Sequence, residues 1–145
     1  MATARDLIKN KGEIQSIAPD ATAFQAMKLM AEYNVGALLV QNTDGDVEGI
    51  VSERDLMRKL DIVGHTSKDT LIRDVMTSKV LYVESTQSLE ECMALMSDKS
   101  IRHLPVYHGE KLIGLISVRD VLREIIAEQK SMISHLEHYI HGGVQ

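Results

Sequence analysis

Apolar residues recur along the chain at spacings that predict the same short elements twice. Helical spacing predicts a helix from about Thr22 to Tyr33 with one apolar face, made of Ala23, Ala26, Met27 and Met30. In the second copy of this helix the expected N-cap is Ser88, and the apolar face is made of Leu89, Cys92, Met93 and Met96. Both helices are therefore expected to bury one side.

Apolar runs of strand length accompany each predicted helix. A helical turn, an extended stretch and a buried strand are expected at residues 4–7, 13–17 and 37–41 and, in the second copy, at residues 72–75, 79–83 and 103–107. A turn that contains Gly45 or Gly109 then leads into a closing strand and a last helix. The order helix–strand–helix–strand–strand–helix thus occurs twice, with an offset that decreases from 68 to 65 residues.

The doubled order predicts an α/β (α+β) fold, a tandem repeat of two β-α-β-β-α units packed sheet to sheet as one pseudo-two-fold module. We expect the repeats at residues 1–64 and 65–127, followed by a C-terminal helical extension at residues 128–145. A polar stretch, residues 62–70, would join the two halves. Each half alone has a small core, and a pair can share one.

The closing strand of each copy ends in the pattern Gly-x-x-Ser-x-x-Asp, at residues 49–55 and 114–120. A Ser at a helix start can cap the first backbone N–H groups, where the helix dipole also attracts an anion. An Asp one turn later accepts hydrogen bonds only, which suits it to the paired hydroxyls of a ribose. The same residues fit a plain capping box, so a purely structural role stays open for either copy.

The last helix carries its apolar face much further than the corresponding helix of the first copy, which is expected to end near Asp61. The face consists of Val118, Leu122, Ile125, Met132, Leu136 and Tyr139, and the expected stop is Gly142-Gly143. We expect the extra residues to bind a partner, in the first place another copy of this chain. The alternative is that they fold back on their own unit.

Composition and charge narrow the classes of function. A formal net charge of −5 disfavours a general nucleic-acid binder, and an aromatic content of 3% leaves few side chains for base stacking. The single cysteine, Cys92, cannot form an internal disulfide and fits a reducing compartment. No leader pattern and no apolar run of membrane-spanning length occurs in the sequence, so we expect a cytoplasmic protein with no membrane partner.

From about Ala4 to Ile126 the chain resembles the cystathionine-β-synthase (CBS) domain pair, also called a Bateman module. Residues 35–40 and 101–106 resemble the core-strand segment of that family, and the two Gly-x-x-Ser-x-x-Asp patterns resemble its nucleotide signature. The chain is similar to stand-alone bacterial members, because no enzyme, channel or transporter domain accompanies the pair. The resemblance implies a regulatory module, not an enzyme, that binds AMP, ADP, ATP or NAD in the cleft between the repeats.

The resemblance also implies roles for single residues. Asp55 and Asp120 would hold ribose hydroxyls, while Ser52 and Ser117 would face phosphate. The adenine would be walled partly by the first strand of the other repeat. This places Ile14 and Gln15 at the Asp120 site and Val80 and Leu81 at the Asp55 site, and the motif strands would add Ile50 and Ile116.

The two implied sites differ in charge. Arg102 and His103 stand at the entry of the second core strand, where similar family members place phosphate-binding groups, whereas the first copy has Gly36 and Ala37. Charge-assisted hydrogen bonds to phosphate are about twice as strong as neutral ones. We therefore expect the Asp120 site to prefer the more highly charged phosphate. Two further basic residues, Arg54 and Arg119, either reach phosphate or are solvated.

The same residues also admit other functions. Cys92 on an apolar helix face fits an inert core thiol better than a nucleophile. Asp55 and Asp120 hold equivalent positions, which suits two alike binding sites better than an acid–base pair. The remaining alternatives are a metal at His135, His138 and His141, for which the fold would have to supply further ligands, and a pair with empty sites.

The sequence therefore predicts a homodimeric sensor of adenine nucleotides that holds no metal. Nucleotide binding would favour one of two conformations, and an effector protein would respond to that shift. AMP, ADP, ATP, NAD(H) and S-adenosylmethionine share the adenosine half that the motifs would recognise, so the sequence does not select among them.

Overall fold

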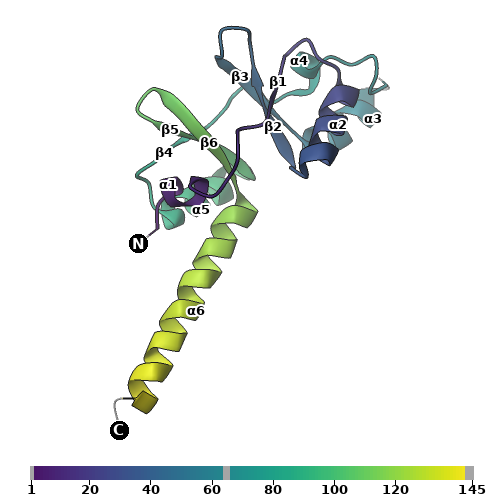
Figure 1. Cartoon of the computed structure of the whole chain (residues 1–145). Helices are drawn as coiled ribbons and strands as arrows, with labels where there is room; N and C mark the ends of the chain where they lie inside the picture. Colours follow the sequence, from purple (N-terminus) through teal and green to yellow (C-terminus); the bar gives the residue numbers. More distant parts are fainter. Residues whose placement is uncertain (1, 64–65, 143–145) are drawn as a thin grey trace. The chain divides into compact units, whose positions relative to one another are not determined.

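The computed structural model describes residues 2–63 and 66–142, and of residues 61–63 and 142 only the backbone. The chain forms two compact units, each with one motif (Figure 1). The first unit is Glu13–Leu81, and the second combines Met1–Gly12 with Tyr82–Gln145. The first residues of each repeat thus complete the compact unit of the other repeat.

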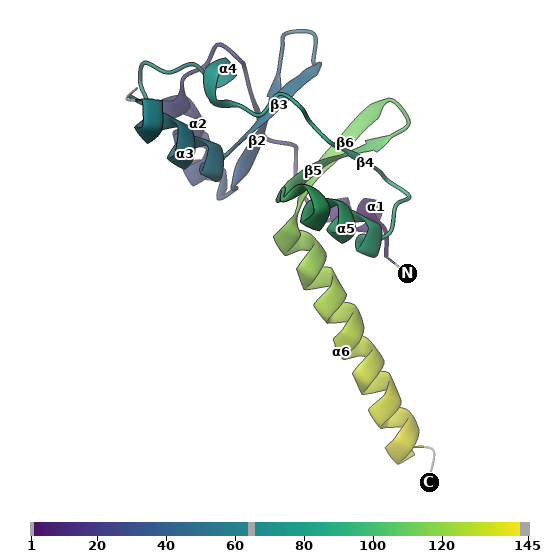
Figure 2. The same ribbon diagram turned by 180° about the vertical axis from the view of Figure 1, so that it is seen from behind.

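The first unit contains a three-stranded sheet in the order β1-β2-β3. Its strands and helices are β1 (Ser16–Ile17), α2 (Ala23–Tyr33), β2 (Ala37–Gln41), β3 (Val47–Ser52), α3 (Glu53–Val63) and α4 (Ile72–Val75). β1 is parallel to β2, and β2 is antiparallel to β3. The three helices lie together on one side of the sheet (Figures 1 and 2).

The second unit repeats this architecture with the sheet order β4-β5-β6. Its elements are α1 (Ala4–Ile8), β4 (Val83–Glu84), α5 (Leu89–Lys99), β5 (His103–His108), β6 (Lys111–Ser117) and α6 (Val118–Gly142). The α+β class and the doubled order of elements are therefore confirmed. The extended stretches at residues 13–17 and 79–83 are wrong in extent, because β1 and β4 pair over only two residues each.

Equivalent caps begin the central helix of each unit. Thr22 Oγ1 accepts from the backbone N–H of Gln25 at 3.2 Å, and Ser88 Oγ accepts from that of Glu91 at 3.1 Å. Each cap is a full capping box, which satisfies N–H groups that a helix start leaves free. The predicted start of α2 and the predicted N-cap of α5 are confirmed.

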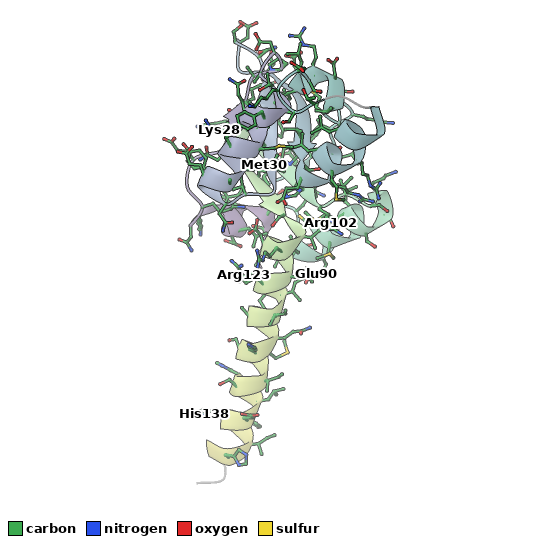
Figure 3. The ribbon with its side chains drawn as sticks, turned by 90° about the vertical axis from the view of Figure 1, so that its right-hand side faces the viewer. Lys28, Met30, Glu90, Arg102, Arg123 and His138 are labelled. Carbon is green, nitrogen blue, oxygen red and sulfur yellow. The ribbon has the colours of Figure 1, made fainter. Side chains whose placement is uncertain are left out.

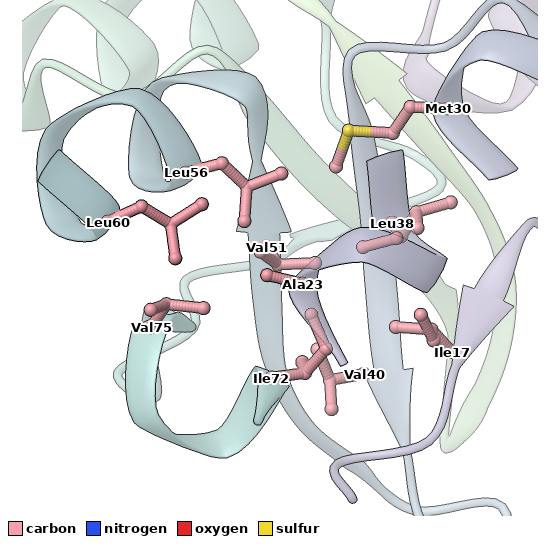
Figure 4. Close-up of a cluster of buried hydrophobic side chains, with 11 residues drawn as sticks. Ile17, Ala23, Met30, Leu38, Val40, Val51, Leu56, Leu60, Ile72 and Val75 are labelled. Carbon is pink, nitrogen blue, oxygen red and sulfur yellow. The ribbon is translucent and has the colours of Figure 1, made fainter. Parts of the chain in front are cut away.

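Buried aliphatic side chains fill the space between the first sheet and its helices (Figure 4). This cluster consists of Ile17, Ala23, Ala26, Met30, Leu38, Val40, Val51, Leu56, Leu60, Ile72 and Val75. The second unit buries the corresponding residues of α5, including Leu89, Cys92 and Met96. Met27 was expected in the core but is 38% exposed, because the face that α2 buries is narrow and Met27 lies at its edge.

α6 continues well beyond the sheet that it follows. Its side chain Glu128 accepts from the backbone N–H of Ala2 at 3.1 Å, and every described side chain from Gln129 to His141 is exposed. Figure 3 labels Arg123 near the start of this helix and His138 near its end. The alternative, that the extension folds back on its own unit, is wrong for the described residues. The first copy's helix also runs further than expected, to Val63 instead of Asp61.

Candidate functional site: two serine–aspartate helix starts

Each motif places its Ser at the last position of a strand and its Asp in the first turn of the next helix. Ser52 ends β3 and Ser117 ends β6. Across the sheet, Ser52 pairs with Ala37 and Ser117 pairs with His103. Each sheet thus holds its own helix start, and the two do so at equivalent positions, as the repeat predicts.

In the first unit, Ser52 and Asp55 form a closed capping arrangement. Asp55 Oδ2 accepts from Ser52 N–H at 3.0 Å and from the Ser52 hydroxyl at 3.1 Å, and Ser52 Oγ lies 3.2 Å from the Asp55 backbone nitrogen. The other carboxylate oxygen, Oδ1, accepts from the Thr77 hydroxyl at 3.1 Å and lies 3.5 Å from Lys59 Nζ. Both oxygens of Asp55 therefore have protein partners.

The second unit builds the same arrangement with a different third partner. Asp120 Oδ2 accepts from Ser117 N–H at 2.8 Å, and Ser117 Oγ accepts from Asp120 N–H at 3.1 Å. The ammonium of Lys11 lies 2.6 Å from the same Oδ2, in an ion pair whose side chains are 40% and 21% exposed. Burial raises the pKa of Asp120, but the Lys11 ammonium and the Ser117 N–H outweigh it, so the pKa is lowered overall.

Thr77 and Lys11 are equivalent partners of the two motif carboxylates, but they are held in place differently. Thr77 is tied by backbone, since its N–H donates to Ile50 O at 2.8 Å and its carbonyl accepts from Ile50 N–H at 2.9 Å. Lys11 Nζ instead donates to Leu115 O at 2.9 Å, and Leu115 is the residue of β6 that matches Ile50. The first carboxylate is thus held by a neutral hydroxyl on a fixed backbone, and the second by a charged side chain. Neither contact could be predicted from the sequence.

The glycine of each motif lets the incoming segment lie directly on the strand. A Cβ on Gly114 would lie 2.6 Å from Ile8 Cδ1, and one on Gly49 would lie 2.7 Å from Met76 Sδ and 2.8 Å from the Thr77 carbonyl oxygen. Such separations are far below van der Waals contact. The glycines therefore allow close packing of these segments on the strands.

Residues 36 and 102 contribute to the helix starts through their carbonyl groups. Gly36 O accepts from Glu53 N–H at 3.0 Å, and Arg102 O accepts from Val118 N–H at 2.9 Å. The side chain of Arg102 is exposed (Figure 3), His103 is half-buried and Ala37 is buried. Arg102 is therefore free to point a cation at a ligand near its helix start, whereas Gly36 has none to offer.

The remaining predicted site residues differ in how near the motifs they lie. Arg54 and Arg119 are exposed in the first helical turn, Ile50 is half-buried and Ile116 is fully buried. Val80 and Leu81 are half-buried and belong to the same unit as Asp55. Ile14 and Gln15 are half-buried too, but they belong to the first unit and Asp120 to the second, so their part in the Asp120 site stays a prediction.

A family model described as "CBS domain" matches the chain twice, at residues 4–62 and 72–127. The chain belongs to the CBS-domain family. The resemblance drawn from the doubled motifs is thereby confirmed, and each matched range holds one Ser–Asp helix start, so both are in CBS repeats.

Related CBS proteins match over most of this chain. The mitochondrial CBS domain-containing protein CBSX3 of Arabidopsis thaliana is 35% identical over 97% of this chain and 73% of its own length. A structure of a protein with CBS domains from Burkholderia ambifaria MC40-6 is 45% identical with a TM-score of 0.84, covering 88% of this chain and 96% of that one. The hexameric CBS-CP12 protein from bloom-forming cyanobacteria is 30% identical with a TM-score of 0.75, covering 84% and 70%.

The two CBS repeats contain two groups that merit comparison with catalytic sites. Cys92 is fully buried, and burial, with the nearby Glu91 charge, raises the pKa of its thiol to about 11, which opposes the thiolate that a nucleophile needs. Ser85 Oγ lies 2.9 Å from His108 Nδ1, but Ser85 is only 1% exposed, which denies a substrate access to the hydroxyl. Neither group resembles a working nucleophile.

The described residues also bear on metal binding and on membrane spanning. Among the described residues, no three His, Cys, Asp or Glu side chains gather closely enough to hold a metal ion. His135, His138 and His141 are exposed along α6. None of the described helices combines the length and the apolar character that crossing a bilayer requires.

Proposed function

We propose that this CBS pair is a regulatory module that binds an adenosine-containing nucleotide (AMP, ADP, ATP or NAD) at its Ser–Asp motifs. Asp55 and Asp120 would accept hydrogen bonds from the ribose hydroxyls, and Ser52 and Ser117 would face phosphate at the helix starts. The observation that carries the proposal is the repetition of one arrangement. A carboxylate and a hydroxyl are fixed at a helix N-terminus in both units.

The chemistry of these groups suits a sugar and its phosphate. Each carboxylate oxygen can accept two hydrogen bonds, and a ribose diol presents two donors side by side. The first-turn side chains Arg54 and Arg119 are exposed close to the helix starts and supply positive charge. Both features favour an anionic ligand that also carries neighbouring hydroxyls.

The two sites are proposed to differ in preference. The exposed guanidinium of Arg102 is available to the Asp120 site, whereas Gly36 and Ala37 leave the Asp55 site uncharged at that point. We propose that the Asp120 site prefers the more highly charged phosphate and that the Asp55 site is weaker or admits a bulkier tail. Titration of Arg102→Ala tests this: two identical sites, unchanged by the substitution, would dispose of the asymmetry.

We propose that the module acts as a cytoplasmic homodimer and reports nucleotide binding to an effector protein by population shift. The exposed apolar side chains of α6 support self-association: Met132, Leu136 and Tyr139 are 66%, 56% and 78% exposed. Monomeric proteins rarely leave a contiguous apolar face of this kind in water. The hexameric CBS-CP12 protein is a related CBS protein that assembles from several copies.

A second candidate function is a purely structural pair whose sites stay empty and whose role is oligomerisation. The observation in its favour is that each motif already completes its own hydrogen bonds as a capping box. Mass spectrometry of small molecules released from the purified protein separates the two functions. Release of an adenine nucleotide at a stoichiometric level supports the sensor, and a smaller amount released from Asp120→Ala with an intact fold assigns the second site. If no nucleotide is released, and if AMP, ADP, ATP and NAD all leave the melting temperature unchanged, the structural pair is supported.

A further inference from the structure

We propose that Lys11 sets the ligand specificity of the Asp120 site: its ammonium excludes neutral nucleosides and admits ligands that carry phosphate. This inference rests on the proposed function and concerns a residue that lies far from the motif in sequence. Lys11 belongs to the first repeat in sequence, yet it completes the motif of the second repeat.

The hydrogen bonds of Asp120 explain the exclusion. Its Oδ2 accepts from Ser117 N–H at 2.8 Å and from Lys11 Nζ at 2.6 Å, which uses both lone pairs of that oxygen. A ribose diol that engages both carboxylate oxygens therefore has to displace the ammonium. Displacement costs a short, partly buried ion pair and also the bond from Nζ to Leu115 O.

A phosphate group offsets this cost by offering the displaced ammonium a new ionic partner, and a nucleoside without phosphate does not. Lys11 carries its charge at the end of a flexible side chain that is 40% exposed, so the displaced ammonium can move to an anion bound at the nearby helix start. Adenosine offers the ammonium no such partner. The Asp120 site therefore distinguishes charged nucleotides from neutral nucleosides even without a contribution from Arg102.

The Asp55 site has only a weaker equivalent of this selection. Thr77, which holds Asp55, is neutral and is fixed by two backbone hydrogen bonds to Ile50. Lys79 occupies the position of the repeat that matches Lys11, but within the described chain it makes no ion pair with Asp55. Lys59, on the same helix, pairs with Asp55 Oδ1 at 3.5 Å, but this pair is longer than that of Lys11, and Lys59 Nζ donates to Val75 O at 2.8 Å. The first carboxylate thus keeps its neutral partner whether or not a ligand carries phosphate.

The test compares adenosine with AMP by calorimetric titration in an Asp55→Asn background, in which the Asp120 site is read alone. With Lys11 present, AMP should bind at least about tenfold more tightly than adenosine, since a hydrogen bond to a charged group is of that order. Lys11→Met should reduce this ratio by about tenfold, raising the affinity for adenosine and lowering that for AMP. Lys11→Arg should restore most of the ratio.

Lys9→Met is the matched control, because it removes the same charge from the same segment and, among the residues that the structure describes, Lys9 forms an ion pair only with Asp6, at 3.6 Å. An unchanged ratio in Lys11→Met, equal to that of Lys9→Met, would overturn the role of Lys11 and leave nucleotide binding intact. Adenosine binding that appears only in Lys11→Met would support the role. If neither AMP nor adenosine binds the parent or any variant, the proposed function fails together with this inference.

Discussion

The hydroxyl of Thr77 donates a 3.1 Å hydrogen bond to Asp55 Oδ1, although the two residues are 22 positions apart and belong to different repeats in sequence. The backbone of Thr77 is hydrogen-bonded to Ile50 in both directions. These bonds already hold Thr77 beside Asp55, so little conformational entropy is lost when its hydroxyl donates to the carboxylate. The start of the second repeat in sequence therefore completes the motif of the first repeat.

Removing this hydroxyl should weaken the first unit. Thr77→Val keeps the shape of the side chain but leaves Asp55 Oδ1 with Lys59 alone, so we expect the free energy of unfolding to fall by about 1 kcal/mol. Urea denaturation measures the change, with Ser78→Ala, an exposed neighbour, as the control. Equal stability of Thr77→Val and Ser78→Ala would show that the hydrogen bond contributes nothing.

The two motif glycines should respond differently to a rescue. Gly114→Ala and Gly49→Ala should each lower the free energy of unfolding by about 1–3 kcal/mol, because the new methyl group meets atoms closer than 3 Å. At Gly114 all the close atoms belong to the Ile8 side chain, whereas at Gly49 one of them is the Thr77 carbonyl oxygen.

A second substitution should therefore relieve only one of the clashes. Ile8→Ala should recover part of the stability lost in Gly114→Ala, while Met76→Ala should recover little in Gly49→Ala, because the carbonyl oxygen stays in place. Chemical denaturation of the four single and two double variants measures both couplings. Equal rescue at the two sites would contradict the packing described.

Cys92 should make the fold sensitive to alkali. Its folded-state pKa is raised from 9.0 to about 11 by burial, so its contribution to stability is complete below pH 9 and is lost as the pH rises toward 11. Over that range we expect a loss of about 2–3 kcal/mol from this group. Cys92→Ala should not show this component, and Ala26 holds the matching position of the first unit. If the free energy of unfolding falls equally between pH 9 and pH 11 in the parent and in Cys92→Ala, this role of Cys92 is contradicted.

The exposed apolar face of α6 should hold copies of the chain together. Leu136→Glu places a charge in that face and should shift the chain toward the monomer in sedimentation equilibrium. The unfolding of the compact units should not change, because Leu136 is 56% exposed and contributes little to either core. Glu137→Lys, which alters charge at the exposed neighbouring position, is the control. Association that is identical in all three proteins would place any interface elsewhere.

The sequence could predict what depends on local pattern. Helical spacing and caps gave α2 and α5, and the two Gly-x-x-Ser-x-x-Asp patterns gave both helix starts with the correct Ser and Asp. It could not predict the third partner of each carboxylate. The repeat makes Lys11 equivalent to Lys79, but only Lys11 reaches a motif aspartate, because that depends on which segment packs on which strand. Such packing between segments far apart in the sequence cannot be read from a local sequence pattern.

The most direct test of the central claim is the stoichiometry of nucleotide binding measured by calorimetry in four proteins: the parent, Asp55→Asn, Asp120→Asn and the double variant. Asn keeps the size of the side chain and removes one acceptor oxygen and the charge. The account predicts two sites per chain in the parent, one in each single variant and none in the double variant, with all four folded. Full binding retained in the double variant would contradict it.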